Sequence, residues 1–200
     1  MKHHLLRKAE YYWYTIKNHL YSKWYKLFLG HVGRGTVIRR HCQLEGDSLE
    51  NVTIGDLCLI DTNCVIGCRS LLKRNEIEIK PELRIGNNCN LGQYNHISAV
   101  NRITIGNNLL TGRFVLITDN SHGHFNYDEL NVHPSERQVV SKGEIVIGNN
   151  VWIGDKVSIL SGVHIGDGCI VGANSVVLHD IPPYSMAAGI PAVVIRKISN

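Results

Sequence analysis

Aliphatic residues recur at every sixth position through the C-terminal part of the chain. The repeated position holds Ile147, Ile153, Ile159, Ile165, Val171 and Val177, and glycine follows it at 148, 154, 166 and 172. A period of six matches neither an α-helix, with 3.6 residues per turn, nor a single strand, with a period of two. It indicates a chain that turns a corner every six residues and stacks each turn on the one before. The predicted fold is therefore an all-β solenoid, a parallel β-helix of hexapeptide repeats.

The same register extends toward the N-terminus and predicts roughly five to six coils over residues 31–179. The inward aliphatic position is held there by Ile38, Leu44, Ile54, Ile60, Ile66, Ile85, Leu91, Ile97, Ile105 and Ile117. Thr111 is the polar member of this series. The fifth residue of each hexad is expected to be inward and small, and five of the six cysteines occupy it. An ordinary β-sandwich would instead show period-two alternation and irregular turn spacing.

Residues 1–30 lie outside the repeat, and an amphipathic α-helix is predicted over 3–29, ended by Gly30. Apolar residues recur there at helical spacings, at Leu6, Trp13, Ile16, Leu20, Trp24 and Leu27. The segment carries six basic residues against Glu10, a net charge of +5, and eight of the fourteen aromatic residues of the chain. Two roles stay open for it. It covers the open end of the solenoid, or it contacts the headgroup region of an anionic membrane.

Two segments interrupt the repeat. Residues 71–84 are rich in charge and are predicted to leave one coil as a surface excursion. Residues 119–146 are rich in His, Asn, Asp, Ser and Gly, and are predicted to protrude as a loop. A loop of this length inside a compact repeat is usually functional. It carries His122, His124 and His133.

The end of the chain also departs from the repeat. Residues 180–200 contain Pro182 and Pro183 near their start, and proline cannot donate a backbone hydrogen bond to a neighbouring strand of a sheet. The apolar run at 192–198 predicts a final strand or a short helix that closes the solenoid.

Charge and cysteine content narrow the class of protein. The net charge of the chain is +4, and residues 1–30 hold all of the excess, so no basic stripe for a nucleic acid follows the solenoid. The cysteines form no CxxC pair, and nothing in the sequence reads as a secretory signal. No stretch approaches the ~18 apolar residues of a membrane span. We expect a reduced, cytoplasmic protein, peripheral at the inner face of the membrane if the helix binds lipid.

The sequence resembles the hexapeptide-repeat acyltransferases, in particular the galactoside and maltose O-acetyltransferases and the O-acetyltransferases of lipopolysaccharide and capsule. The resemblance covers residues 85–198. It implies a left-handed parallel β-helix, a homotrimer, and acetyl-CoA bound in the groove between neighbouring subunits. The segments that carry it are ITDNSHG (117–123), IGNNVWIG (147–154) and DIPPYSMAAGIPAVVIRKI (180–198).

The family's catalytic histidine falls in a His-Pro or His-Gly step after the repeat breaks, which corresponds here to His122 before Gly123. Acyl transfer from a thioester to a hydroxyl needs a base, and histidine is suited to this because its pKa lies near neutrality. His122 is therefore the predicted general base, which returns its proton to the leaving thiolate without a covalent intermediate. Asp119 or a backbone carbonyl is expected to orient the imidazole, and N–H groups of a glycine-rich turn to stabilise the oxyanion.

The resemblance also implies a coenzyme site. Trp152 matches a family tryptophan expected to wall the site near the acetyl group or His122, and ordinary corner packing would explain it equally well. Ala173, through its backbone, and Arg196, through its charge, match positions that contact coenzyme A. Lys197 is expected to assist Arg196. No metal ligand is predicted, and the family's acceptor-binding residues do not carry over to this sequence.

The predicted function is acetyl-CoA-dependent O-acetyl transfer to a sugar hydroxyl, on a surface polysaccharide or its precursor. An N-acetyltransferase of an amino sugar is a close alternative, because the same base would serve. A carbonic anhydrase-like zinc enzyme is a second alternative. His96, His122 and His164 share the last hexad position, but no two histidines have the five-residue spacing of that family's ligands. A non-catalytic solenoid scaffold is the third, and the DNSHG motif argues against it.

Overall fold

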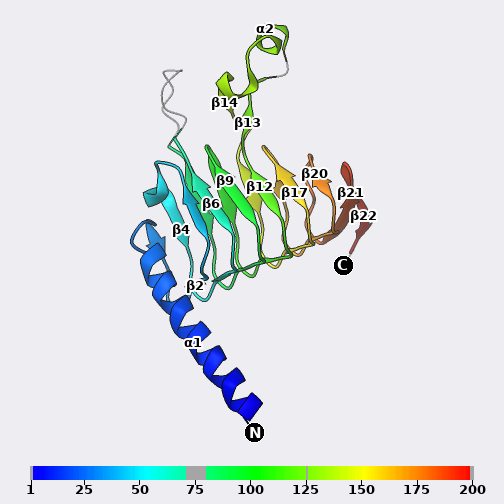
Figure 1. Ribbon diagram of the computed structural model, residues 1–200. Coiled ribbons are helices and arrows are strands. Elements are labelled where there is room, and N and C mark those ends of the chain that lie inside the picture. Colours follow the sequence, from blue (N-terminus) through cyan, green and yellow to red (C-terminus); the bar gives the residue numbers. More distant parts are fainter. Residues whose placement is uncertain (1, 71–79, 125, 199–200) are drawn as a thin grey trace.

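The computed structural model describes residues 2–70, 80–124 and 126–198, and within the first helix the side chains of residue 13 and of residue 15 onward. The chain winds into a solenoid with three faces, each a sheet of short stacked strands, and a long helix leaves one end of it (Figure 1). On each face the strands of successive coils pair in parallel. This arrangement is the parallel β-helix that the six-residue period predicts.

The chain visits three faces in turn, which we call A, B and C, so that they meet at an A–B, a B–C and a C–A edge. Face A has six strands, in the order β1 (His31–Val32), β4 (Val52–Ile54), β7 (Glu82–Ile85), β10 (Arg102–Ile105), β15 (Ile145–Ile147) and β18 (His164–Ile165). Face B has eight, in the order β2 (Val37–Ile38), β5 (Leu59–Ile60), β8 (Asn90–Leu91), β11 (Leu110–Thr111), β16 (Trp152–Ile153), β19 (Ile170–Val171), β21 (Ser185–Gly189) and β22 (Ala192–Lys197). Face C has six, in the order β3 (Gln43–Glu45), β6 (Val65–Cys68), β9 (His96–Ala99), β12 (Leu116–Thr118), β17 (Ser158–Leu160) and β20 (Val176–Val177).

The interior is filled by the aliphatic hexad position, whose members stack in register from coil to coil. Ile38 lies beside Ile60 on face B, and Ile117 lies between Ile97 and Ile159 on face C. All of these side chains are buried. The small fifth position is buried as predicted, and all six cysteines are buried free thiols. Burial of this continuous apolar column supplies the main stabilisation of the fold.

At the A–B edge, the turns of successive coils are joined through polar side chains. Three of these turns continue with an asparagine at positive φ, a conformation that asparagine tolerates, at Asn88, Asn108 and Asn150. One residue in each coil takes part, and in chain order these residues are Arg34, Asp56, Asn87, Asn107, Asn149 and Asp167. The backbone N–H of each except the last donates to the side-chain carboxyl or amide oxygen of the following one, at 2.6–2.9 Å.

Thr111, the polar member of the inward series, has its hydrogen bonds satisfied inside the core. Its Oγ1 accepts a bond from the Gly92 N–H at 2.9 Å and another from the side-chain amide of Asn95. Asn95 is also buried, and its Oδ1 accepts a bond from the Val115 N–H at 2.8 Å. Asn95 occupies the small inward position of its coil, so the two polar residues form one buried pair across neighbouring coils.

Helix α1 (Lys2–Tyr25) ends earlier than the predicted residue 29, and its last turns lie over the first coil. Ser22 Oγ lies 2.9 Å from both the nitrogen and the carbonyl oxygen of Ile38, and the Tyr25 hydroxyl donates to the Cys42 carbonyl at 2.8 Å. Asn18 is buried on the same side of the helix. This contact uses a polar face, and the described members of the apolar stripe that identified the helix are exposed. Among the described residues, no helix is long and apolar enough to cross a membrane.

The opposite end of the solenoid is closed by a β-hairpin. β21 pairs in parallel with β19, and β22 pairs antiparallel with β21, so the closing segment is a strand, one of the two forms expected for it. The Ile190–Pro191 peptide bond in the connecting turn is cis. Of the excursion predicted at 71–84, residues 71–79 lie outside the described residues, and β7 begins at Glu82.

The buried pair gives a test of the core. Thr111→Val keeps the side-chain shape but leaves the Gly92 N–H and the Asn95 amide without their acceptor, so we expect a loss of about 2 kcal/mol in the free energy of unfolding. Thr104→Val is the matched control, because Thr104 is partly exposed on the outer side of β10. It should change stability by no more than about 0.5 kcal/mol. Denaturant unfolding of both variants measures this, and equal stabilities would contradict the assigned role of Thr111.

Candidate active site

The interruption of the repeat opens as a β-hairpin at the C–A edge. β13 (Ser121–His122) pairs antiparallel with β14 (Val139–Val140), while α2 (Tyr127–Leu130) and η2 (Pro134–Glu136) form the outer part. Figure 1 shows this hairpin projecting from the solenoid. The segment therefore has more regular structure than the plain loop that its composition predicts. It places His122 on the first strand, opposite Val139 and just beyond the end of β12 (Leu116–Thr118).

Gly123 fixes the course of the chain directly after His122. Its φ is +75°, and a Cβ at this position would clash with the Glu129 carboxylate. That carboxylate accepts the His124 N–H at 2.6 Å, and the Gly123 N–H donates to the Gln138 carbonyl at 2.7 Å. A residue with a side chain would strain the backbone and displace Glu129. The His-Gly step is therefore a structural requirement of the hairpin as well as a sequence motif.

His122 lines a cavity of about 700 Å³ between the hairpin and the outer side of face C. His96 and Ser98 from β9 and Thr118 from β12 contribute to its floor, and Arg137 from the hairpin lines it from the other side. His122 itself is exposed, so its imidazole is accessible to a ligand in the cavity. The walls combine hydroxyl, imidazole, guanidinium and carboxylate groups, which suits a polar ligand rich in hydroxyls.

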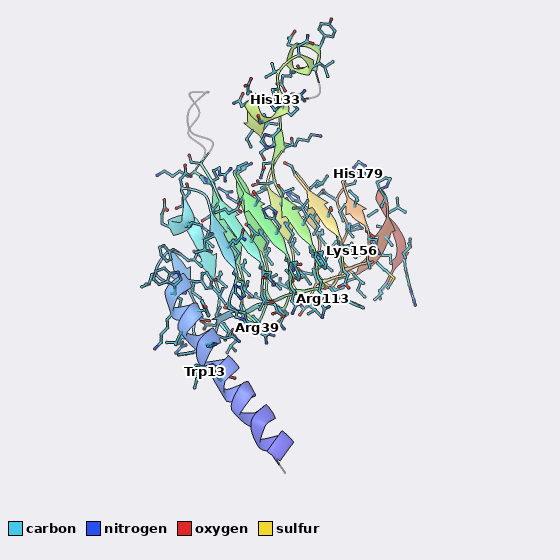
Figure 2. All side chains as sticks on the ribbon, in the orientation of Figure 1. Trp13, Arg39, Arg113, His133, Lys156 and His179 are labelled. Carbon is cyan, nitrogen blue, oxygen red and sulfur yellow. The ribbon has the colours of Figure 1, made fainter. Side chains whose placement is uncertain are left out.

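The other two histidines of the interruption are placed differently. His124 is exposed on the hairpin and does not line the cavity. His133 lies on the hairpin below its tip and outside the body of the solenoid (Figure 2), where its Nδ1 is 2.7 Å from the Ser135 hydroxyl. Of the three, His122 is the one that reaches the cavity.

Asp119 does not orient the imidazole. Its carboxylate is fully buried and accepts the N–H groups of Val100 and Asn101 at 2.8 and 2.9 Å, and no hydrogen bond joins it to His122 in the described structure. Burial raises the pKa of this carboxyl, while the backbone hydrogen bonds lower it. Asp119 therefore fixes the base of the hairpin to the turn between β9 and β10. The sequence shows that turn only as a two-residue slip of the repeat.

The predicted coenzyme residues lie on the other side of the solenoid. Trp152 faces outward from face B and is 52% exposed, between Leu110 and Ile170 in the neighbouring strands. Arg196 and Lys197 are exposed on β22, at the end of the same sheet. Face B is opposite the C–A edge of a three-sided solenoid, so one chain does not bring these residues together with His122.

Ala173 lies in an exposed turn at the B–C edge. The series of hydrogen bonds that joins successive turns at the A–B edge has no complete counterpart there. The Arg113 N–H donates to the Asp155 carboxylate of the next coil at 2.8 Å. Beyond it, the N–H groups of Asp155 and Ala173 meet no acceptor within the described parts of the chain. The coenzyme contact expected for the Ala173 backbone stays a prediction.

The three histidines that share a hexad position do not converge. His96 and His122 line the same cavity, whereas His164 lies on β18 of face A. Within residues 2–70, 80–124 and 126–198, no group of three or more His, Cys, Asp and Glu side chains is placed to hold a metal ion.

Ser98, Asn120 and Arg137 line the cavity but did not stand out in the sequence. Ser98 and Thr118 are register neighbours on the outer side of face C, so strand alternation could have indicated both. The Asn120 side chain donates to the Ser98 carbonyl at 3.1 Å. Arg137 belongs to the hairpin, where the repeat gives no register from which its position could be deduced.

The role of Asp119 can be tested by Asp119→Asn. The substitution places an amide N–H₂ against a backbone N–H donor, and we expect it to lower the free energy of unfolding by about 2 kcal/mol. Asp128→Asn removes an exposed carboxylate of α2 in the same hairpin and should cost no more than about 0.5 kcal/mol. If Asp119 instead oriented the base, Asp119→Asn would leave stability unchanged and reduce only turnover.

Comparison with known proteins agrees with this architecture. Residues 144–179 match the family model described as bacterial transferase hexapeptide (six repeats). WbbJ of Escherichia coli (strain K12), named as a lipopolysaccharide biosynthesis O-acetyl transferase, is 39% identical over 117 residues, which are 56% of this chain and 59% of that protein. The galactoside O-acetyltransferase of the same strain is 41% identical over 103 residues, which are 49% and 45% of the two chains. This chain thus spans less than two thirds of the length of either relative.

Among solved structures, a mutant form of AntD, an N-acyltransferase from Bacillus cereus, in complex with dTDP and coenzyme A, has a similar fold. The TM-score is 0.72 over 89% of this chain and 88% of that chain, at 18% sequence identity. At this identity the likeness concerns the fold, and it confirms the left-handed parallel β-helix that the resemblance implied. The chain thus carries the hexapeptide repeat at residues 144–179 and is similar to these O-acetyltransferases over about half of its length.

Proposed function

We propose that this protein is an acetyl-CoA-dependent O-acetyltransferase that acts on a sugar hydroxyl of a surface polysaccharide or its precursor. The observation that carries the proposal is the position of His122. It lies at the family's base position, on a hairpin strand fixed by Gly123, with its imidazole accessible at the wall of a polar cavity. The sequence relatives named for O-acetyl transfer favour a hydroxyl acceptor.

The chemistry needs one proton to be moved twice. Neutral His122 accepts the proton of the acceptor hydroxyl as its oxygen attacks the thioester carbonyl carbon. The carbon–sulfur bond then breaks, the acetyl group remains on the acceptor oxygen, and the imidazolium returns the proton to the thiolate. The products are the acetyl ester and free coenzyme A, and His122 ends in its starting protonation state.

The cavity beside His122 is the proposed acceptor site. Ser98 and Thr118 present hydroxyl groups, and Asn120 presents an amide, along the outer side of face C. Groups of this kind exchange hydrogen bonds with sugar hydroxyls, and they would hold one hydroxyl within reach of the imidazole. An amino sugar would present an amine to the same base, so N-acetylation differs from the proposal in the acceptor and not in the machinery.

Acetyl-CoA is the proposed acyl donor, held by residues on the side of face B. Arg196 and Lys197 offer cationic groups for its phosphates, and the Ala173 N–H offers a donor that meets no acceptor among the described residues. The AntD structure, which contains coenzyme A, supports this donor class for the fold. Since these residues lie opposite His122, we propose that the working site joins His122 of one subunit to face B of a neighbour in a homotrimer. The apolar outer row of Leu110, Trp152 and Ile170 supports a subunit contact on that face.

His122→Ala tests the base directly. Loss of the proton acceptor should lower kcat by about 10²–10⁴ and leave the affinity for acetyl-CoA within a few-fold. His124→Ala is the matched control, since His124 belongs to the same hairpin and does not line the cavity. The assay measures thiol release from acetyl-CoA across a panel of sugars, amino sugars and lipid-linked glycans. Normal turnover in a folded His122→Ala protein would remove His122 from the mechanism, and activity with amino sugars alone would replace O- by N-acetylation.

Mixed trimers test the shared site. Arg196→Ala should weaken acetyl-CoA binding by about tenfold or more, whereas Arg34→Ala, an exposed arginine of the first coil, should not. When His122→Ala and Arg196→Ala subunits are unfolded and reassembled together, about a quarter of the sites should combine one intact residue from each parent. Activity at low acetyl-CoA should then exceed that of either parent. No gain, or a solution mass of one 22.4 kDa chain, would contradict the proposed trimer.

A further inference from the structure

Helix α1 presents two different faces, and the solenoid uses one of them. Asn18, Ser22 and Tyr25 in the last turns of the helix, and Leu29 just beyond it, are buried toward the first coil. The opposite side carries the apolar stripe, formed by Trp13, Ile16, Leu20, Trp24 and Leu27, which are 51–75% exposed. Because the cap is made by the other face, capping does not explain why this stripe is apolar.

The stripe is wide and rich in aromatic residues. With 3.6 residues per turn, the arc from Ile16 to Tyr21 covers about 140° of the helix surface. Tyr21 and Phe28 extend the stripe at its edge and are 40% and 45% exposed. The seam of a coiled coil is narrower than this. Trp13 lies on the part of α1 that projects beyond the first coil (Figure 2), so the stripe continues past the solenoid.

Cationic side chains lie within and beside the stripe. The Lys17 ammonium is 5.2 Å from the centroid of the Trp13 ring, and Lys17 lines a shallow hollow with Leu20, Tyr21 and Trp24. Lys23 is exposed at the other edge. A contact between two helices would bury Lys17 among aromatic rings without a counter-charge, which is costly. At a bilayer surface, both ammonium groups would reach lipid phosphates while the rings enter the acyl boundary.

We propose that the exposed stripe of α1 binds the surface of an anionic lipid bilayer. The occupant follows from charge complementarity, since the segment of residues 1–30 carries +5 and the remainder of the chain −1. The helix lies along the headgroup region and does not cross the bilayer. This binding places the protein peripherally at the inner face of the membrane, where anionic lipids and membrane-borne glycan precursors are accessible. It does not depend on the proposed acyl transfer.

The test compares two neighbouring positions on the helix. Leu20→Glu introduces a charge at the centre of the stripe, and His19→Glu introduces the same charge at an exposed position outside it. The full chain is floated with vesicles of phosphatidylcholine alone and of phosphatidylcholine with phosphatidylglycerol in equal parts. We expect the wild type and His19→Glu to float with the anionic vesicles, and Leu20→Glu to bind them at least about tenfold more weakly. Acetyl transfer to a soluble acceptor should be the same in all three proteins.

The electrostatic part is tested separately. The double variant Lys17→Glu, Lys23→Glu keeps every apolar side chain and should lose the preference for anionic vesicles. Equal flotation of Leu20→Glu and His19→Glu, or wild-type binding that does not distinguish the two vesicle types, would overturn the proposal. A change in the lipid-free mass of the assembly on Leu20→Glu would also overturn it, because the stripe would then be a contact between copies of the chain.

Discussion

Every strand of this molecule depends on the hydrogen bonds that join its coil to the next, because most strands are only two to four residues long and could not persist alone, even with the apolar column buried inside. Each coil satisfies its backbone groups on the coils before and after it, so the two ends of the solenoid need other partners. At the first coil, Ser22 meets both backbone groups of Ile38, and Tyr25 meets the Cys42 carbonyl. At the last coil, β22 turns back along β21 and leaves the parallel arrangement.

Stacking also determines where chemistry can be placed. An insertion at an edge leaves the coils on both sides in register, provided that the turn beneath it keeps its hydrogen bonds. Asp119 meets this condition by accepting the N–H groups of Val100 and Asn101 where the hairpin departs. The hairpin can then hold His122 over face C without disturbing the column of isoleucines inside. At the B–C edge, the Arg113 N–H donates to the Asp155 carboxylate, and the described residues show no such bond from Asp155 to the next coil at Ala173.

The sequence predicted the features that the repeat controls. The six-residue period identified the inward isoleucines and five of the six buried cysteines, and it marked Thr111 as an exception. It did not reveal Asn95 as the partner of Thr111, because that contact crosses between coils and depends on side-chain hydrogen bonding. Residues of the interruption were harder to place, since a hairpin outside the repeat has no register. For this reason Asp119 was expected beside the imidazole, although its carboxylate points into the turn below. His122 could be singled out only through the family motif, because composition alone does not distinguish it from His124.

The same physical reasoning accounts for the orientation of α1. An amphipathic pattern predicts that a helix buries its apolar face, but the end of this solenoid offers backbone polar groups beside the apolar surface that Tyr25 and Leu29 cover. Ile38 is already fully buried within its coil. An apolar helix face laid over it would leave the Ile38 N–H and the Ile38 and Cys42 carbonyls without partners, at a cost of about 1–3 kcal/mol for each group. A serine and a tyrosine hydroxyl remove that cost, so the polar face is the one that caps. The apolar stripe consequently stays exposed, and its tryptophans and lysines suit the boundary between water and lipid.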